Sequence, residues 1–387
     1  MNFRRQLLLA AVLLASVCSA RSAEQLEKGI WTIPFTDDGV CIRIPVNCFG
    51  ETLYFVVDTG ASIPIFDTRF SERLGPETGN ARMSTGAAII AGAPIYSCPD
   101  LSVGDLFLTA DKALCQSLRA VEMVTGERCD GILGISSLKN YIVTIDFDTG
   151  TLVVATTLKD EAKDSAIAVP LLPVKERHVA VDAILNNSHH VKLMIDSSDS
   201  AAISLNPADW AGVFADTEKS KFHPATMALV GGKTHPSVFA RIGSIKLARI
   251  EQKNLICAFA PNPNTQSALG LAFLRRYKAT FDFTKQTLYL APSKHCAEPD
   301  NPDMSGLHLL RKDEGTVVDS VDEGSAAASA GIQPGDKLQV INGEDTGSLK
   351  MAAIRQRLKA GNDREVRVQI ARGSTRKDIS FRLKAPF

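Results

Sequence analysis

Two segments of this chain repeat each other without a gap, and this repeat limits the folds that the chain can adopt. Residues 130–155, "DGILGISSLKNYIVTIDFDTGTLVVA", align with residues 267–291, "SALGLAFLRRYKATFDFTKQTLYLA", when Gly134 is placed on Gly270. The alignment then pairs Leu138 with Leu274, Tyr141 with Tyr277, Asp146-Phe147 with Asp282-Phe283, and Leu152 with Leu288. Such agreement indicates one structural unit that is present twice.

Each repeat is preceded by another matching segment, in which an apolar run ends with one Asp and two small residues. These segments are "FVVDTGASIPIF" (55–66) and "LMIDSSDSAAIS" (193–204), and each has a Ser four positions after its Asp. Asp58 and Asp196 stand at nearly the same spacing before the downstream repeats. The chain therefore contains two homologous halves, in which Asp58 and Asp196 occupy equivalent places.

Both halves are expected to consist of β-strands. Short runs rich in Val, Ile, Thr, Phe and Tyr alternate with turn residues such as Gly, Pro, Asn and Asp. Residues 144–154 and 280–290 each predict a β-hairpin. The expected fold class is mainly β, with two homologous β-barrel-like lobes at 24–156 and 157–297 and a charged linker candidate, 157–166, at their junction.

A third domain is expected after the second lobe. Residues 298–303 are rich in Pro and acidic side chains, a composition that suits an exposed linker. Residues 304–387 then combine strand-like runs with one amphipathic helix, predicted over 348–360, whose apolar residues fall on one face. This region is therefore expected to be an α+β domain.

The N-terminus has the pattern of a secretory signal peptide over residues 1–23. Arg4 and Arg5 precede an apolar run that is too short to span a bilayer, and small residues follow the run. A lipid anchor at Cys18 is a weaker alternative, because the bulky Val17 stands where that signal needs a small residue. We therefore expect an exported protein, periplasmic or secreted, and no later stretch predicts a transmembrane span.

Charge and cysteine content exclude several classes of function. The chain has 43 basic and 43 acidic residues, so it lacks the excess positive charge of a typical nucleic-acid-binding protein. The cysteines after Cys18 are odd in number, and the sequence does not reveal their pairing. Because no two are spaced as Cys-x2-4-Cys, and no phosphate-binding loop is present, we expect neither a metal nor a cofactor.

The two Asp segments belong to a larger pair of motifs. Asp58-Thr59-Gly60 follows an apolar strand and is followed by the apolar-apolar-Gly segment Ile132-Leu133-Gly134. The second half repeats this pattern as Asp196-Ser197-Ser198 and Ala268-Leu269-Gly270. A further Asp-Thr-Gly at 148–150 lies in a predicted turn, so the position within the repeat distinguishes the first one. Over both lobes the pattern resembles the aspartic proteases of the pepsin and retropepsin group.

This resemblance implies an aspartic endopeptidase that needs no metal. Asp58 and Asp196 would share one proton and activate a water molecule for attack on a peptide bond. Thr59 and Ser197 would brace the two loops against each other. Gly60 would let backbone N–H groups approach the carboxylate.

Ser198 departs from the family pattern, which has glycine at this position. A side chain there would push the loop from its usual path if a positive φ or close packing is required. Asp199 adds a charge that either raises a neighbouring pKa or faces solvent. Two alternatives therefore stay open: a homodimer that pairs Asp58 from two chains, and a catalytically inactive peptide-binding protein.

The same resemblance implies polypeptide substrates that lie in the cleft between the lobes. Flaps would cover the substrate, and residues 81–94 and 225–236 stand where flaps are expected. Neither segment contains the Tyr that is familiar from pepsin.

The last region resembles a PDZ domain of the kind found in bacterial exported proteases. The residues that carry the resemblance are Gly306-Leu307-His308-Leu309, Val317-Val318, Gly324-Ser325-Ala326-Ala327, Ala330-Gly331-Ile332, Gly335-Asp336-Lys337-Leu338 and Ile341-Asn342-Gly343. A PDZ domain would bind a peptide C-terminus, with its carboxylate at Gly306 to Leu309 and its last side chain in a pocket formed by Ile354 and Leu358. His308 is expected to point away as a strand residue. The alternative is a PDZ fold that packs on the lobes or mediates assembly.

Overall fold

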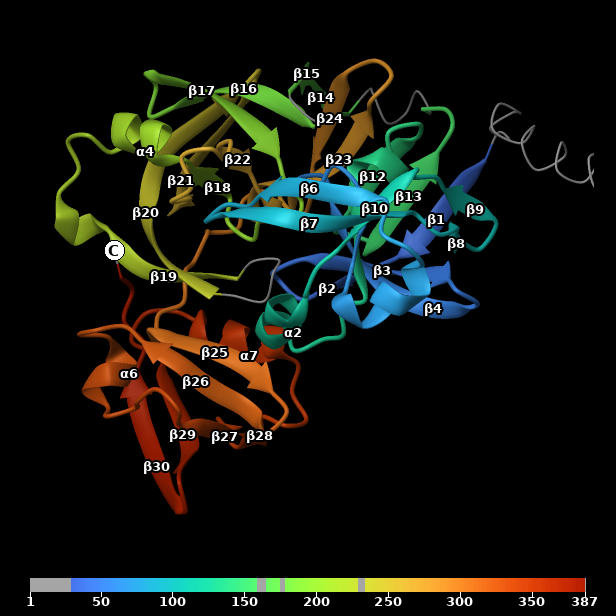
Figure 1. The fold of residues 1–387 in the computed structure, drawn as a ribbon. Coiled ribbons are helices and arrows are strands. Elements are labelled where there is room, and N and C mark those ends of the chain that lie inside the picture. The colour runs from blue at the N-terminus through green and yellow to red at the C-terminus, as the bar shows by residue number, and fades with distance from the viewer. Residues whose placement is uncertain (1–28, 159–164, 175–177, 229–233, 387) are drawn as a thin grey trace, which may run out of the picture.

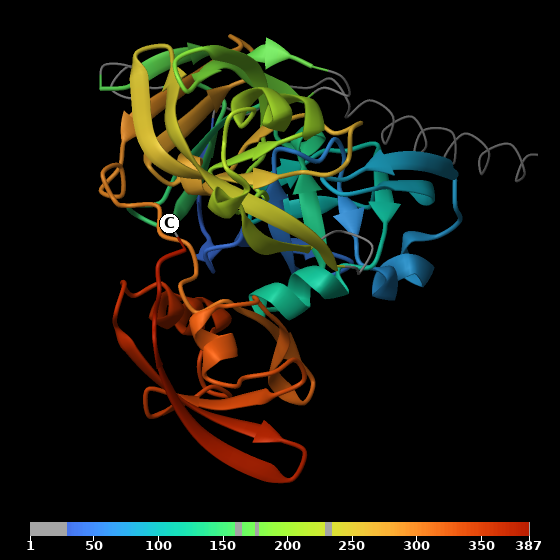
Figure 2. The same cartoon turned by 90° about the vertical axis from the view of Figure 1, so that its left-hand side faces the viewer.

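The computed structural model describes residues 29–158, 165–174, 178–228 and 234–386. The predicted signal segment 1–23, with Cys18, lies outside the described residues. So do parts of the linker candidate 157–166 and of the second expected flap. Figure 1 shows two β-rich lobes side by side above a smaller C-terminal domain, and Figure 2 shows the same arrangement from the side. The expected fold class, mainly β, is confirmed.

The first lobe is a curled sheet in which the strand that ends at Asp58 is central. In spatial order the strands are β6 (Gly79–Ser84), β7 (Ile89–Ser97), β10 (Lys112–Cys115), β5 (Ile65–Phe66), β11 (Gly131–Gly134), β4 (Glu51–Asp58), β3 (Ile42–Cys48), β8 (Leu101–Val103) and β9 (Leu106–Leu108), with β2 (Thr36–Asp37) beside β3. Helix α2 (Arg119–Thr125) and the 3-10 helices η1 (Thr68–Leu74) and η2 (Ile135–Ser137) join these strands. Burial alternates only at the start of β4, whereas Phe55–Asp58 are all buried, so the sheet is covered on both faces near Asp58.

The second lobe repeats this plan. Its strands lie in the order β15 (Leu172–Pro173), β16 (Val179–Leu185), β17 (His189–Ile195), β22 (Ala268–Leu269), β18 (Ile203–Leu205), β21 (Ile250–Phe259), β20 (Thr234–Leu247) and β19 (His223–Ala228). The helices are α4 (Pro207–Val213), η4 (Lys219–Lys221) and α5 (Leu271–Leu274). Asn206 caps α4 by accepting a hydrogen bond from the N–H of Asp209, and Pro207 suits the first helical position.

A third sheet is shared by the two lobes. Its order is β1 (Ile30–Pro34), β13 (Thr151–Ala155), β12 (Ile142–Asp146), β23 (Tyr277–Asp282), β24 (Thr287–Pro292) and β14 (Ile167–Pro170). The predicted hairpins are confirmed as β12–β13 and β23–β24, but they pair with each other instead of staying in separate lobes.

The register of the β12–β23 pairing shows that an approximate twofold axis relates the two copies of the repeat. Thr144 lies opposite Thr280, and their hydroxyl oxygens are 2.8 Å apart. These two residues are equivalent in the gapless alignment. Because equivalent residues face each other, an approximate twofold axis passes between β12 and β23. One continuous apolar core runs through both lobes, so neither lobe is an independent unit.

The C-terminal domain has a separate hydrophobic core. Its strands lie in the order β25 (Leu307–Lys312), β26 (Gly315–Val321), β27 (Lys337–Ile341), β29 (Glu365–Arg372) and β30 (Thr375–Arg382), with β28 (Glu344–Asp345) beside β27. Helices α6 (Ala326–Ser329) and α7 (Met351–Leu358) cover the core. The helix predicted over 348–360 is shorter than expected, because the Ser348 hydroxyl donates to the Asp345 carbonyl in a turn and Gly361 follows with a φ of 127°.

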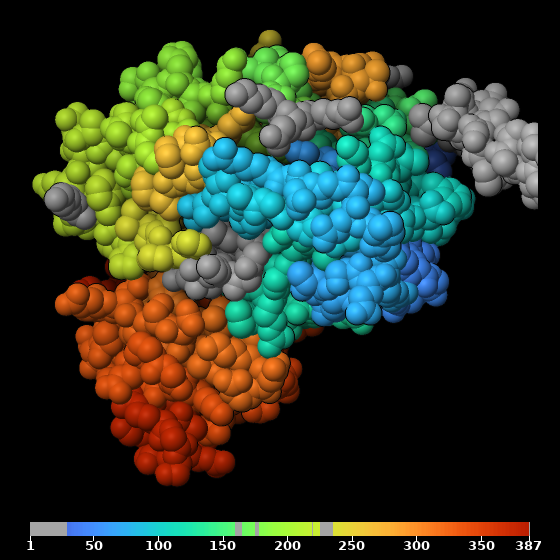
Figure 3. Space-filling model, viewed as in Figure 1, coloured from blue at the N-terminus to red at the C-terminus, as the bar shows by residue number. Residues whose placement is uncertain are grey.

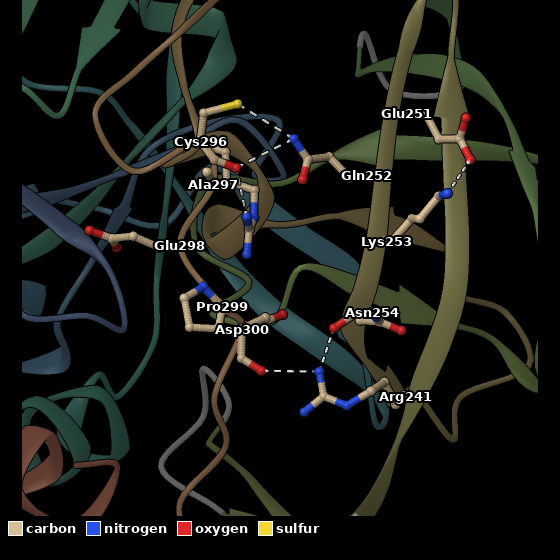
Figure 4. Close-up of a pocket in the computed structure, with 11 residues that line it drawn as sticks. Arg241, Glu251, Gln252, Lys253, Asn254, Cys296, Ala297, Glu298, Pro299 and Asp300 are labelled. Carbon is tan, nitrogen blue, oxygen red and sulfur yellow. Dashed lines mark hydrogen bonds and ion pairs between the residues drawn. The ribbon is translucent and has the colours of Figure 1, made fainter. Parts of the chain in front are cut away.

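The connector before the C-terminal domain is attached to the second lobe. Figure 4 shows a pocket of about 490 Å³ where this connector crosses β20 and β21. Arg241 donates to the Asp300 carbonyl at 3.2 Å, and the Ile256 N–H donates to the Asp300 carboxylate at 2.8 Å. Arg276 holds the connector at its start by donating to the Cys296 carbonyl at 2.9 Å. The predicted linker is therefore attached to the second lobe at Asp300, and the chain just before it is held at Cys296.

Three further features concern the described residues. No helix among them is long and apolar enough to cross a membrane. All seven cysteines among them are free thiols. Within the same ranges, no three His, Cys, Asp or Glu side chains form a group that could hold a metal ion.

Candidate active site

The strand pairing of each lobe explains why a glycine follows two apolar residues downstream of each Asp. In the first lobe β11 runs parallel to β4 and places Gly134 beside Asp58. A Cβ on Gly134 would lie 2.5 Å from the Ile63 carbonyl carbon, so the chain passes too closely for any other residue. In the second lobe β22 runs parallel to β17, and a Cβ on Gly270 would collide with the Ala201 carbonyl. Asp58 therefore ends its strand and Asp196 directly follows its strand, and beside each strand runs a short parallel strand that leads to a tightly packed glycine, Gly134 or Gly270.

The two Asp loops are joined by reciprocal hydrogen bonds at the twofold axis. The Thr59 N–H donates to the Ser197 hydroxyl at 3.0 Å, and the Ser197 N–H donates to the Thr59 hydroxyl at 3.0 Å. Each hydroxyl also donates to a carbonyl of the opposite lobe, Thr59 to Ile195 at 2.8 Å and Ser197 to Val57 at 2.8 Å. Both side chains are buried. The expected bracing residues thus contact each other, and they hold Asp58 and Asp196 on adjacent loops.

Gly60 lies between the two carboxyl groups. Its N–H donates to Asp58 Oδ1 at 2.7 Å. A Cβ on Gly60 would lie 2.5 Å from Asp196 Cγ and 2.6 Å from Asp196 Oδ2, so the Asp196 carboxyl packs directly on the bare Cα. Gly60 does not have a positive φ. Glycine is therefore needed here because the Asp196 carboxyl approaches too closely for a side chain, and not because of the backbone conformation.

Ser198 binds the carboxylate that precedes it. Its N–H and its hydroxyl both donate to Asp196 Oδ1 at 2.9 Å, and the Asp199 N–H donates to the same oxygen at 3.0 Å. Ser198 is not among the residues with positive φ, so the side chain imposes no left-handed strain. The loop therefore accepts serine where the family has glycine, and the hydroxyl adds a donor to the carboxylate.

The local environment favours protonated carboxyl groups. Burial, together with the charge of Asp196, raises the pKa of Asp58 to about 8, although nearby donors, among them the Gly60 N–H that binds Asp58 Oδ1, act in the opposite direction. Burial and the charge of Asp196 also raise the pKa of Asp199 to about 7. Asp199 is partly buried and does not simply face solvent, and its charge adds to burial in raising the pKa of Cys257.

The first expected flap is a hairpin whose tip is tied to the other lobe. Residues 81–94 fall in the β6–β7 hairpin, which extends across the front of the molecule in Figure 3. The Asn262 side-chain amide donates to Ser84 Oγ at 3.1 Å, to the Thr85 carbonyl at 2.8 Å and to the Ala88 carbonyl at 3.2 Å. Asn262 is buried in the loop before β22. Asn262 could not be predicted as part of the site, because a single Asn in a loop matches many turn patterns.

Asn262→Ala is expected to release the hairpin tip. The change leaves two backbone carbonyls of the tip without this donor, which should cost about 1–3 kcal/mol. Hydrogen exchange followed by mass spectrometry should show faster exchange over 84–90 than in the native protein. Asn264→Ala is the matched control, because Asn264 is exposed and its side chain contacts only Asn262 among the described residues. Equal exchange in the two variants would contradict a tie through Asn262.

The expected peptide-binding residues of the C-terminal domain fall into two groups. Leu307, Leu309, Ile354 and Leu358 are all buried in the domain core, so the last two do not form an open pocket. His308 is a partly buried strand residue whose Nε2 lies 2.8 Å from Asp322 Oδ1. Burial acts to lower the pKa of His308, but the hydrogen bond and charge of Asp322 outweigh it and raise that pKa. Gly306 takes a φ of 75° and packs against Ser325.

Comparison with known proteins identifies two domains. Residues 44–137 match the family described as aspartyl protease, and residues 317–372 match the PDZ domain family. The first match contains Asp58, Thr59 and Gly60 but ends before the second lobe. Curated proteins gave no match. Among solved structures, basic 7S globulin from soybean is similar at a TM-score of 0.41 and 10% identity, over 70% of this chain and 96% of that chain.

Proposed function

Because this chain carries an aspartyl protease domain and a PDZ domain, we propose that it is an exported aspartic endopeptidase that acts as a single chain. Asp58 and Asp196 would be its catalytic pair. The observation that carries this proposal is the packing of the Asp196 carboxyl on Gly60, whose N–H binds Asp58. Export rests on the pattern of residues 1–23.

The proposed mechanism uses the shared proton of the two carboxyl groups. The Asp58 carboxyl, with its raised pKa, would hold the proton and donate it to the carbonyl oxygen of the scissile peptide bond. The Asp196 carboxylate would remove a proton from water, whose oxygen then attacks the carbonyl carbon. The tetrahedral intermediate would collapse as Asp196 passes the proton it took from water to the leaving amine, the C–N bond breaks, and Asp58 recovers its proton from a hydroxyl of the intermediate. Because the two carboxyl groups share a proton, a titration of the site would report pKa values of the pair and not of Asp58 or Asp196 alone.

The contacts between the lobes favour one chain over a homodimer. In a dimer of first lobes, Thr59 would need to face the Thr59 of a second copy. That place is taken by Ser197, which makes reciprocal hydrogen bonds with Thr59. The catalytically inactive alternative rested on Ser198, and the unstrained Ser198 supports a competent loop instead. Substrates would be polypeptides beneath the β6–β7 and β19–β20 hairpins.

A pH series of proteolysis tests the proposal. Purified protein is mixed with a fluorescently labelled unfolded protein from about pH 3 to about pH 9, with and without a statine-type inhibitor that mimics the tetrahedral intermediate. Cleavage should persist to near-neutral pH and be lost as the pH rises past about 8, because the pair then loses its shared proton. The inhibitor should block cleavage and raise the melting temperature. No cleavage at any pH, together with no inhibitor-induced shift in melting temperature, would favour the inactive binding protein.

A further inference from the structure

The position where a peptide would bind the PDZ domain can be defined from the fold. We give the name PDZ groove to the surface formed by β25, α7 and the loop 303–307, where the PDZ resemblance places a peptide. Within the described ranges, β25 pairs with β26 alone, so its other edge carries no paired strand. An added peptide would place its carboxylate at the N–H groups of the loop and extend along β25 toward Lys312.

The loop at one end of the PDZ groove already binds a carboxylate, that of Asp303. Asp303 Oδ1 accepts hydrogen bonds from the Ser305 N–H at 2.8 Å, the Gly306 N–H at 3.0 Å and the Ser305 hydroxyl at 2.5 Å. The next N–H, that of Leu307, donates to the Ser305 hydroxyl at 3.1 Å. Two backbone donors of the expected carboxylate-binding segment, the N–H groups of Gly306 and Leu307, are therefore engaged within this loop.

Helix α2 of the first lobe lies at the other end of the PDZ groove. It contacts both β25 and α7, and Figures 1 and 2 show it directly above the C-terminal domain. Arg119 forms an ion pair with Asp313 at 2.8 Å, just beyond β25. On the α7 side, Arg355 donates to the Val124 carbonyl at the C-terminus of α2, where a cation is favourable. A peptide that continued along β25 would meet α2.

The two parts pack closely at Gly126, the residue that follows the last turn of α2. A Cβ on Gly126 would lie 2.5 Å from Met351 Cγ and 3.5 Å from Arg311 Cβ. Met351 begins α7, and Arg311 lies in β25, so Gly126 fits between the two walls of the PDZ groove. An exposed ion pair such as Arg119–Asp313 contributes little free energy to this interface. The contact at Gly126 has no room for an added methyl group, so it makes the interface specific for this helix end.

We propose that the PDZ groove is a docking surface for helix α2 of the same chain, so that the first lobe, and not a free peptide C-terminus, is its resident partner. The partner is thus a short helix end that presents Arg119, the Val124 carbonyl and Gly126. An external peptide can bind only after α2 has left the PDZ groove. The C-terminal carboxylate of the peptide must also displace the Asp303 side chain from the loop N–H groups.

Contacts within the first lobe connect helix α2 to the loop that carries Asp58. Glu122 of α2 accepts a hydrogen bond from the Cys129 N–H at 3.0 Å, two residues before β11. β11 in turn places Gly134 beside Asp58. Helix α2 also contacts β19 of the second lobe. Release of α2 would therefore loosen the strand beside Asp58, a consequence that rests on the proposed function, whereas docking itself does not.

A methyl group at Gly126 tests the docking. Gly126→Ala should raise hydrogen exchange over 119–126 and 351–358 by about tenfold, the scale of one overpacked contact. Gly104→Ala is the matched control, because Gly104 has a similar positive φ of 60° and its added Cβ would meet nothing within 4 Å. Equal exchange over both segments in Gly126→Ala and Gly104→Ala would overturn the proposal.

Peptide binding provides a second readout that needs no protease activity. The probe is a pool of short fluorescein-labelled peptides with an apolar last residue and a free carboxylate, beside the same pool with amidated ends. The native protein should bind the free-carboxylate pool at least about tenfold more weakly than Gly126→Ala does. Asp303→Ala in that background should strengthen binding of the free-carboxylate pool only. Equal binding by the native protein and Gly126→Ala, or no binding by any variant, would overturn the competition between α2 and a peptide.

Discussion

Asp58→Asn is expected to lower kcat/KM for peptide hydrolysis by about a thousandfold or more, because an amide cannot carry the proton that the pair shares. The amide oxygen can still accept the Gly60 N–H, so the loop geometry should survive. The measurement is the initial rate on a quenched fluorescent polypeptide near neutral pH. Asp148→Asn is the matched control, because Asp148-Thr149-Gly150 is the same tripeptide in an exposed turn. Similar losses in both variants would contradict a special role for Asp58.

The same substitution should raise stability at alkaline pH. The pKa of Asp58 is about 8 in the fold and returns to its ordinary value, near 3.8, on unfolding. Between these values the folded protein binds a proton that the unfolded chain has released, so the native protein loses stability as the pH rises. Asp58→Asn removes this proton uptake. Its melting temperature should exceed that of the native protein at about pH 8 and converge with it below about pH 4. A lower melting temperature for Asp58→Asn than for the native protein at alkaline pH would mean that ionised Asp58 does not destabilise the fold.

Thr59→Val is expected to destabilise the protein by about 2–4 kcal/mol, because it leaves the Ser197 N–H and the Ile195 carbonyl buried without partners. The loss should appear as a lower denaturation midpoint in urea. Activity should fall as well, since these bonds hold the two carboxyl groups on adjacent loops. Thr149→Val is the control, because Thr149 is an exposed residue of the other Asp-Thr-Gly and its hydroxyl contacts only Thr151 among the described residues.

Ser197→Ala should behave like Thr59→Val, and the two effects should not add. Each substitution removes one hydroxyl from the reciprocal hydrogen bonds between Thr59 and Ser197. The double variant should therefore lose less stability than the sum of the losses in the two single variants. Additive losses would indicate that Thr59 and Ser197 act independently.

The repeat predicted most of the fold. It placed two equivalent Asp loops, each followed in the chain by an apolar-apolar-Gly segment, because strand runs and glycines are local features of a sequence. The pairing of that segment beside the Asp is seen only in the structure. The bracing residues Thr59 and Ser197 came from the resemblance to the aspartic proteases. Spacing alone does not reveal that their hydroxyls meet.

The remaining features depend on long-range contacts. The shared sheet arises because β12 and β23, far apart in the chain, are equivalent strands that pair across the twofold axis. Asn262 reaches the hairpin tip from another lobe, and Asp303 turns back on its own loop. Ile354 and Leu358 were expected in a peptide pocket, but apolar residues on one helix face fit a core equally well, and here they are in the core.

The activity of Asp196→Asn in a sample shown to be monomeric tests the central claim most directly. A single-chain catalytic pair predicts that kcat/KM falls by about a thousandfold, as in Asp58→Asn, and that mixing the two variants restores nothing. Sedimentation in the assay buffer would establish that each molecule is one chain. Full activity in Asp196→Asn would contradict the single-chain pair and would instead support two copies that combine their Asp58 residues.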